Sequence, residues 1–330
     1  MKKTLLSLVL VGIVGIQAGC VLDPIEQHHT PNPQLVLTAF LRPGAAIDSV
    51  LLTRTVPPDQ YYVWMYTKPV FDQYKVSGAN AVITHAGKTY PLSPRGSGLY
   101  GDPNLIVQAG ETYDIDVTFP QGHEFADRHL TASTTVPSQM RLDPPELDPS
   151  QIARGVLSVE ELLFPKQLAA PDKFGKSGEV NPFRLSWDRV ANAAGYAIEM
   201  SADDTTGTEL LRKRAYEDWK DDDYANPNAR QFLAHTLYMP LPDSIQIEVF
   251  WLGFNYRGWQ DVVVFACDAG LYDYWRTLFG PGGGGGDADI GIIWNVKGGM
   301  GVFGSFSSDT VRTFIKAEWL PSQSLPPKGQ

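Results

Sequence analysis

The sequence predicts a mostly β protein made of tandem β-sandwich domains, with a short helix near the C-terminus and added strands. Short runs that alternate apolar and polar residues recur along the chain, as they do in half-buried strands. The 330 residues include 31 glycines and 25 prolines, which favour turns. They also include 14 tyrosines, 15 phenylalanines and 8 tryptophans, which favour strands. The length allows two or three domains with hydrophobic cores.

Residues 34–140 are the expected N-terminal sandwich. Its predicted strands are residues 35–41, 49–56, 80–85, 88–92, 107–117 and 130–136. In one of them Tyr113, Ile115 and Val117 alternate with aspartates, which places the three apolar side chains on one face. Gly110 followed by Tyr113 resembles the tyrosine corner of immunoglobulin-type sandwiches, in which a tyrosine hydroxyl bonds an upstream backbone group.

A linker with a short helix is expected over residues 141–182. The segment begins rich in proline, and Ser158 and Glu161 match the S-x-x-E pattern of a capping box. We predict that the short helix follows this box and ends at Pro165.

Residues 183–319 are the expected second domain. Strands at 183–188 and 195–200 resemble the second and third strands of a fibronectin type III module, with Trp187 in the core and Tyr196 at the start of a strand. Further strands are expected at 245–250, 260–267, 290–296 and 311–319.

A helix is predicted over residues 268–279, because Asp268 can cap it and Gly280-Pro281 can end it. The glycine run at 280–286 is typical of a flexible loop. Residues 320–330 are expected to be a disordered tail.

The N-terminus has the pattern of a lipoprotein signal peptide over residues 1–19. Lys2 and Lys3 precede an apolar stretch that is too short to span a bilayer, and Ala18-Gly19 precede Cys20. This resembles the bacterial lipobox, although Gln17 stands where a leucine-like residue is usual. We predict that Cys20 is lipidated and that residues 20–33 tether the first domain to its acyl chains. The alternative is an ordinary secretory leader with a chance cysteine.

The net charge restricts which binding partners are expected, and the number of cysteines restricts which disulfides can form. The formal net charge is −10, and loss of Lys2 and Lys3 with the leader makes it −12. This excess of negative charge argues against nucleic acid and against anionic lipid headgroups as partners. The chain has 2 cysteines, so with Cys20 lipidated Cys267 has no disulfide partner, and its apolar neighbours predict a buried side chain.

No catalytic signature is found in the sequence. Gly299 to Gly304 match G-x-G-x-x-G, but the alternation at 311–315 predicts a strand where a dinucleotide-binding unit needs a helix. We therefore expect these glycines to permit tight turns or close backbone packing. The chain contains no H-E-x-x-H, C-x-x-C or G-x-S-x-G motif, and we expect no cofactor.

Two groups of residues are weak candidates for metal binding. His123, Asp127 and His129 would share one face if their stretch were a strand, whereas in a turn they need not converge. Clustered carboxylates suit calcium, which makes Asp221, Asp222 and Asp223 weak candidates. The alternative for both groups is a solvated surface loop.

The best candidate for a recognition surface is an aromatic insertion between two strands of the first domain. It contains six aromatic residues, Tyr61, Tyr62, Trp64, Tyr66, Phe71 and Tyr74. Such side chains can stack on sugars or anchor a protein partner. They can equally cover the edge of the sandwich or fill a core.

Several segments together resemble a known family. They are the lipobox leader, the strands of 35–56, and the segments 79–83, 98–100, 109–113, 132–137 and 295–304. The family is one of uncharacterised envelope lipoproteins, typical of Bacteroidota-like bacteria and described only as a domain of unknown function. The resemblance covers nearly the whole mature chain, and its most specific piece is the N-x-x-G-G-x-G-x-F-G segment at 295–304.

The resemblance implies an accessory role in the outer membrane, because members are often encoded near TonB-dependent transporters. The family has no established catalytic residues to carry over. Our first hypothesis is therefore a non-enzymatic binding or accessory lipoprotein, with the membrane face open. The alternatives are a structural or adhesive envelope protein, and an unrecognised hydrolase that uses loop carboxylates.

Overall fold

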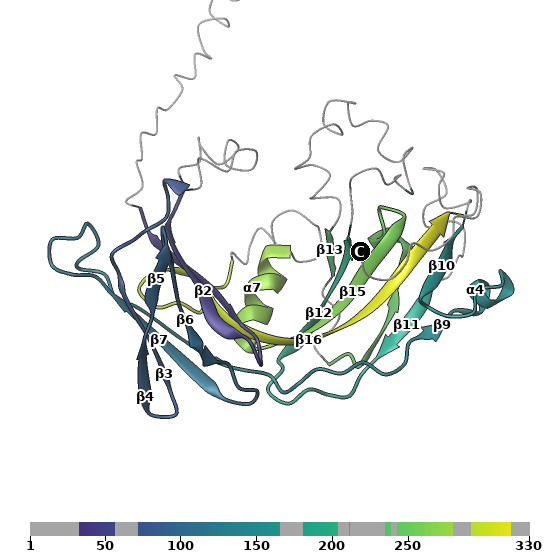
Figure 1. The fold of residues 1–330 in the computed structure, drawn as a ribbon, viewed down its shortest axis with the longest axis horizontal. Coiled ribbons are helices and arrows are strands. Elements are labelled where there is room, and N and C mark those ends of the chain that lie inside the picture. Colours follow the sequence, from purple (N-terminus) through teal and green to yellow (C-terminus); the bar gives the residue numbers. More distant parts are fainter. Residues whose placement is uncertain are drawn as a thin grey trace, which may run out of the picture. The chain divides into compact units, whose positions relative to one another are not determined.

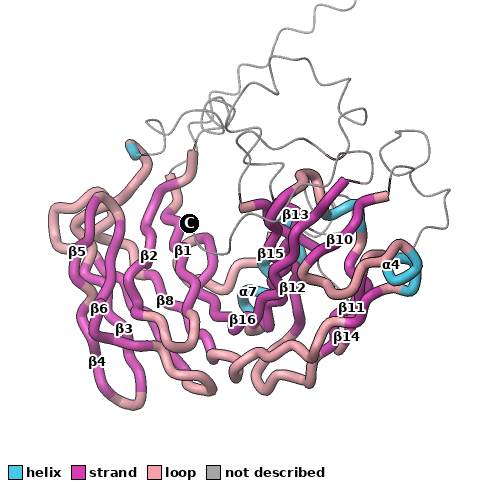
Figure 2. The backbone as a smooth tube through the Cα atoms, turned by 45° about the vertical axis from the view of Figure 1, so that its right-hand side comes forward, coloured by secondary structure: helices cyan, strands magenta, loops and turns pink. Residues whose placement is uncertain are grey.

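The computed structural model describes residues 33–56, 72–165, 181–203, 211, 235–238, 243–279 and 292–317. Strands form most of this part of the chain (Figure 2). They are arranged in a 9-stranded sheet, a 3-stranded sheet and a 4-stranded sheet. The expectation of a mostly β fold with a short C-terminal helix and added strands is confirmed.

The N-terminal strands build the first sandwich (Figure 1). One layer has the order β4-β3-β7-β8. Its strands are β3 (Asn80–His85), β4 (Lys88–Pro91), β7 (Thr112–Thr118) and β8 (Leu130–Thr135). The other layer contains β1 (Leu35–Leu41), β2 (Ala46–Arg54), β5 (Ser93–Gly96) and β6 (Leu99–Ile106). Alternate residues of both layers meet in one core, in which Leu37, Leu52 and Ile83 have 0% exposure.

The second half encloses a core of its own. Its smaller sheet has the order β14-β11-β9, with β9 (Glu146–Leu147), β11 (Phe183–Ser186) and β14 (Gln246–Val249). The facing strands are β10 (Glu161–Phe164), β12 (Gly195–Ala202), β13 (His235–Tyr238) and β15 (Gly258–Cys267). Trp187 is 2% exposed in this core, and its ring lies 5.1 Å from that of Tyr196 in β12. The predicted placement of both residues is confirmed.

The strand β16 (Met300–Ala317) joins the two halves. It pairs in parallel with β1 through residues 300–305, in parallel with β10 through 314–317, and antiparallel with β15 through 306–315. The 9-stranded sheet therefore contains strands from both sequence segments that we assigned to separate domains. The first sheet gains a strand that lies more than 250 residues away in sequence.

Three helical segments complete the described structure. They are α4 (Pro149–Ala153), the 3-10 turn η4 (Trp251–Gly253) and α7 (Ala269–Phe279). The predicted helix near the C-terminus is confirmed as α7. It packs on the face of the large sheet opposite the two sandwich cores, where Leu271 and Val302 are buried.

Two predicted elements were wrong. Residues 161–164 form strand β10 instead of the helix expected after Ser158, because Leu162 and Phe164 are fully buried in the second core. The short helix of this region is α4, which lies earlier and is capped by Asp148. Residues 292–296, the described part of the strand expected at 290–296, form no strand. The Asn295 side chain accepts from the Phe303 N–H and donates to the Phe303 carbonyl, which are the backbone groups that a neighbouring strand would use.

Each half contains a tyrosine hydroxyl that fixes an upstream loop. The Gln108 N–H donates to Tyr113 Oη at 2.8 Å, and Gly110 has the positive φ of a tight turn. The Val190 N–H donates to Tyr196 Oη at 3.1 Å in the second half. The tyrosine corner predicted for Tyr113 has this bond, and Tyr196 repeats the arrangement.

We expect the substitution Tyr113→Phe to lower the free energy of unfolding by about 1–2 kcal/mol, because it leaves the Gln108 N–H without its acceptor. Tyr196→Phe should cost a similar amount through Val190. Urea unfolding followed by tryptophan fluorescence measures both losses. A Tyr113→Phe variant as stable as the parent would show that the bond contributes nothing.

Candidate recognition site

The aromatic insertion lies mostly outside the described residues. Tyr61, Tyr62, Trp64, Tyr66 and Phe71 all fall in that part of the chain. Tyr74 is described, and its side chain is only 6% exposed. For Tyr74 the core-filling alternative therefore applies, and this side chain does not belong to an exposed recognition surface.

Both ends of the insertion are fixed to the first sandwich. On the way in, Thr55 N–H donates to Gln34 O at 2.9 Å and Gln34 N–H donates to Thr55 Oγ1 at 3.2 Å. On the way out, Arg54 N–H donates to Tyr74 O at 2.8 Å, and Lys75 forms a β-bridge with Thr53. The described residues on either side of the insertion, Thr55 before it and Tyr74 and Lys75 after it, are therefore held at the same end of β2.

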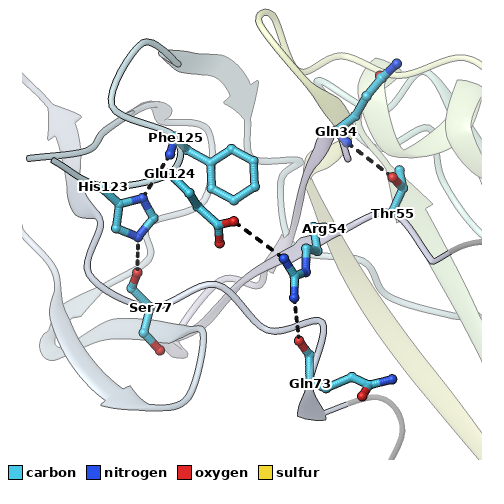
Figure 3. Close-up of polar contacts among 8 residues, drawn as sticks. All are labelled: Gln34, Arg54, Thr55, Gln73, Ser77, His123, Glu124 and Phe125. Carbon is cyan, nitrogen blue, oxygen red and sulfur yellow. Dashed lines mark hydrogen bonds and ion pairs between the residues drawn. The ribbon is translucent and has the colours of Figure 1, made fainter. Parts of the chain in front are cut away.

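Arg54 links these ends to a neighbouring turn (Figure 3). Its guanidinium donates to Gln73 O at 3.4 Å and to the Glu124 carboxylate at 3.5 Å. The Arg54 and Glu124 side chains are 35% and 57% exposed, so this ion pair contributes little stability by itself. Its effect is positional, because one side chain contacts both the exit of the insertion and the turn at 121–127.

His123 fastens the same turn to the exit strand. Its Nδ1 accepts a hydrogen bond from Phe125 N–H at 3.1 Å, and its Nε2 lies 3.0 Å from Ser77 O. Because Nδ1 accepts, Nε2 is the nitrogen that carries the proton and donates to Ser77. The ring also stacks on Phe119 with 4.7 Å between centroids. His123 is therefore a structural residue of this site.

The three residues that would share a face if their stretch were a strand, His123, Asp127 and His129, lie in and beside a turn and are not brought together. His129 Nε2 lies 2.7 Å from Asp116 Oδ2 on β7, while His123 contacts Ser77. Within the ranges that the structure describes, no group of three or more His, Cys, Asp or Glu side chains could hold a metal ion. Asp221, Asp222, Asp223 and the lipidation candidate Cys20 lie outside the described residues.

Cys267 is buried at the end of β15, as the sequence predicts, with 0% exposure. Burial, and secondarily the neighbouring Asp268 carboxylate, raise the pKa of its thiol well above the ordinary value. The thiol is therefore held in its unreactive protonated form.

In a Cys20→Ser background we expect the folded protein to react with a thiol reagent such as DTNB only as fast as it unfolds. Addition of urea beyond the unfolding midpoint should release one thiol per chain within minutes. Rapid labelling of the native protein would contradict the burial of Cys267.

The sequence did not point to a second apolar surface, which lies around α7. Phe40 is 39% exposed and stands 6.3 Å from Trp275 of α7 between ring centroids. Ile292 and Ile293 are both 36% exposed, and Trp294 is 37% exposed with its ring 6.4 Å from Tyr274. The signal that could have revealed it is the run Ile292-Ile293-Trp294 next to an amphipathic helix.

The glycines of the C-terminal motif serve close packing, as expected. Gly301 has φ +106°, and a side chain there would meet Leu37 O at 2.1 Å. At Gly299 a side chain would meet Leu35 O at 2.8 Å, and at Gly304 it would meet Leu271 of α7 at 2.7 Å. Gly301 and Gly304 lie within strand β16, which continues to Ala317, so a strand stands where a dinucleotide site requires a helix.

The described helices are too short or too polar to cross a membrane.

No curated protein matches the chain. Among solved structures, the FN1–FN3 domains of chicken CNTN1 match with 11% identity and a TM-score of 0.22, over 86% of this chain and 68% of that one. A two-domain fibronectin type III segment of chicken tenascin matches with 12% identity and a TM-score of 0.19, over 72% of this chain and 93% of that one. The model of a domain of unknown function, DUF4249, matches residues 22–312, and the chain therefore belongs to this uncharacterised family.

Proposed function

We propose that the mature chain is a non-enzymatic, lipid-anchored accessory protein of the outer membrane that recognises its partner through the aromatic insertion. The partner we propose is a TonB-dependent transporter, because members of the family that the sequence resembles are often encoded near such transporters. The observation that carries the proposal is the hydrogen bonding, beside β2, of the residues that flank the aromatic-rich segment, because binding residues are commonly held on loops by a rigid sheet.

The Arg54 contacts support a recognition role for the insertion. Arg54 bonds the exit of the insertion at Gln73 and the 121–127 turn at Glu124. A rigid base lowers the conformational entropy that the segment loses on binding, which favours affinity. Tyr62 and Trp64, near the middle of the insertion, are the side chains we expect to contribute most of that affinity.

The anchor is tested by metabolic labelling with a palmitate analogue and by membrane fractionation. The parent should be labelled and should sediment with the outer membrane. A Cys20→Ser variant should lose the label and the membrane association together. A Cys20→Ser variant that remains in the membrane without label would contradict lipid anchoring.

The partner is tested by pull-down of the tagged lipoprotein from outer membranes solubilised in mild detergent, followed by mass spectrometry. A TonB-dependent transporter should be enriched with the parent and lost with a Tyr62→Ser/Trp64→Ser variant. Trp294→Ser is the matched control, because it removes an exposed aromatic side chain at α7 instead. Recovery of the lipoprotein alone would overturn the accessory role and favour a structural one.

A further inference from the structure

One edge of β16 is left without a neighbouring strand in its middle. On the side away from β15, β1 pairs with residues 300–305 and β10 with residues 314–317. Residues 306–313 lie between these two partners, and no strand among the described residues pairs with them on that side. We call this stretch the open edge. In Figure 1 it is the part of β16 that passes alongside α7 before the strand reaches β10.

The register shows which backbone groups point to the open edge. The Asp268 N–H donates to Ser305 O at 2.9 Å, on the β15 side of β16. In an antiparallel ladder the direction of the backbone groups alternates with each residue. Odd-numbered residues of β16 therefore bond β15, and even-numbered residues point away from it. The Phe314 N–H confirms this alternation, because it donates to Glu160 O on the β10 side at 2.9 Å.

Four residues thus direct their backbone groups to the open edge, namely Phe306, Ser308, Thr310 and Arg312. The Thr310 N–H is bonded by the side chain of its own neighbour, Asp309, at 2.9 Å. The Phe306 N–H belongs to the β1 ladder, because the parallel pairing of Leu41 with Ser305 is made through the residues on either side of Ser305. For the N–H groups of Ser308 and Arg312 and for the four carbonyls, no hydrogen-bond partner is found within the described part of the chain. Thr310 and Arg312 are exposed and Ser308 is half-buried, so this part of the strand is accessible.

The linker stabilises β16 without occupying this edge. Ser307 Oγ accepts from Met140 N–H at 3.1 Å, and Asp309 Oδ2 accepts from Leu142 N–H at 2.9 Å. These are odd-numbered side chains, which stand on the face of the sheet toward the two cores. The linker therefore packs on the core side of the sheet. Its hydrogen bonds do not involve the backbone groups of the even-numbered residues of β16.

We propose that the open edge binds an extended segment of a partner protein by β-strand addition. The eight residues from 306 to 313 span about 26 Å, which accommodates a short strand. The ends of β1 and β10 limit its length, so the slot admits one segment and does not present the long edge that promotes aggregation. Recognition would rest on main-chain hydrogen bonds and would tolerate many side-chain sequences.

Proline substitutions distinguish the open edge of β16 from the edge that pairs with β15. Ser308→Pro removes an N–H that points to the open edge, so the protein should keep its fold with an unfolding midpoint within a few degrees of the parent. Val311→Pro is the matched control, since it removes an N–H that bonds β15 and should strongly destabilise the protein. A Ser308→Pro variant as unstable as Val311→Pro would overturn the proposal.

Binding is measured on the full chain in mild detergent with a fluorescein-labelled peptide of alternating threonine and valine, six residues long. The parent should bind it, Ser308→Pro at least tenfold more weakly, and a copy of the peptide N-methylated at alternate residues should not bind. Single-residue hydrogen exchange supplies the second readout. The amides of Ser308 and Arg312 should exchange fast alone and become protected with the peptide.

Two results would overturn the proposal. Protection of these two amides in the absence of peptide would show that the chain itself fills the slot. Absent binding, or binding unaffected by Ser308→Pro, would show that the open edge does not take an extended backbone. Because these readouts do not involve Cys20, the aromatic insertion or a transporter, their outcome is independent of the proposed function.

Discussion

A Gly301→Ala variant is expected to lose about 3 kcal/mol or more of its free energy of unfolding. Gly301 has φ +106°, a backbone conformation that costs an L-residue energy even where space is free. Here space is not free, because a Cβ atom would lie 2.1 Å from the Leu37 carbonyl oxygen. Relief of that clash would require β1 and β16 to move apart where they pair. The loss is read from urea unfolding followed by tryptophan fluorescence.

Gly122→Ala is the matched control for this variant. Gly122 has φ +91°, but a Cβ atom there would meet nothing within 4 Å. Its loss should be confined to the backbone term of about 1–2 kcal/mol. The excess loss in Gly301→Ala then measures the close approach of β1 and β16. Equal losses in the two variants would mean that β1 and β16 lie further apart at Gly301 than the structure shows.

Local patterns in the sequence were sufficient for much of the fold. The alternation at Tyr113, Ile115 and Val117 predicted β7, and all three side chains are buried. Asp268 followed by an apolar helical pattern predicted α7. These elements depend on side chains within a few residues of each other, so their signal is contained in a short window.

Elements that depend on distant partners were not predictable in the same way. The capping box at Ser158 favours a helix locally, but burial of Leu162 and Phe164 beside β16 stabilises a strand instead. Lys316 of β16 also forms an ion pair with Glu161. Nothing in residues 158–165 indicates the partner strand, which lies some 150 residues further along the chain.

The candidate site shows the same division. Its aromatic composition is visible in the sequence, whereas its base depends on Arg54, Gln73 and Glu124, which meet only in the folded sandwich. Tyr74 belongs to the same aromatic run, yet it is buried. The aromatic composition therefore indicates that a recognition surface can exist. Which of the aromatic side chains face outward depends on how the segment packs against the sheet.

A substitution of Asp268 should distinguish its hydrogen bonds from its charge. The side chain is 5% exposed and accepts bonds from Leu271 N–H at 3.0 Å, Ser305 N–H at 3.1 Å and Thr134 Oγ1 at 2.8 Å. It thus joins β8 of the first sandwich to α7 and β16. Asp268→Ala leaves these buried donors without an acceptor and should cost about 3 kcal/mol or more.

Asp268→Asn is the matched variant, because its amide oxygen can still accept from Leu271 and Ser305. Its NH₂ group can donate to Thr134 Oγ1 in place of the bond that Thr134 donates to Asp268. At pH 7 we expect its free energy of unfolding to lie within about 1 kcal/mol of the parent's. A loss as large as that of the alanine variant would mean that the negative charge is required.

The pH dependence of the difference between the parent and Asp268→Asn follows from the buried carboxylate. Burial raises the pKa of Asp268 above its ordinary value of 3.8, although the bonds from Leu271, Ser305 and Thr134 act in the opposite direction. Between the unfolded and the folded pKa the folded state therefore binds more protons than the unfolded state. Stability must fall as the pH rises through this window, and the cost of burying the charge is fully present above it.

Lowering the pH from 7 towards 4 should therefore stabilise the parent relative to Asp268→Asn, even if both become less stable in acid. Other carboxyl groups, including Asp261, whose pKa burial also raises, titrate alike in both proteins and cancel in the difference. Urea unfolding of the parent and of Asp268→Asn at several pH values measures the difference in their free energies of unfolding. A difference that stays constant, or that moves the other way, would mean that the hydrogen bonds outweigh burial and that Asp268 is a stabilised anion at the junction of β8, α7 and β16.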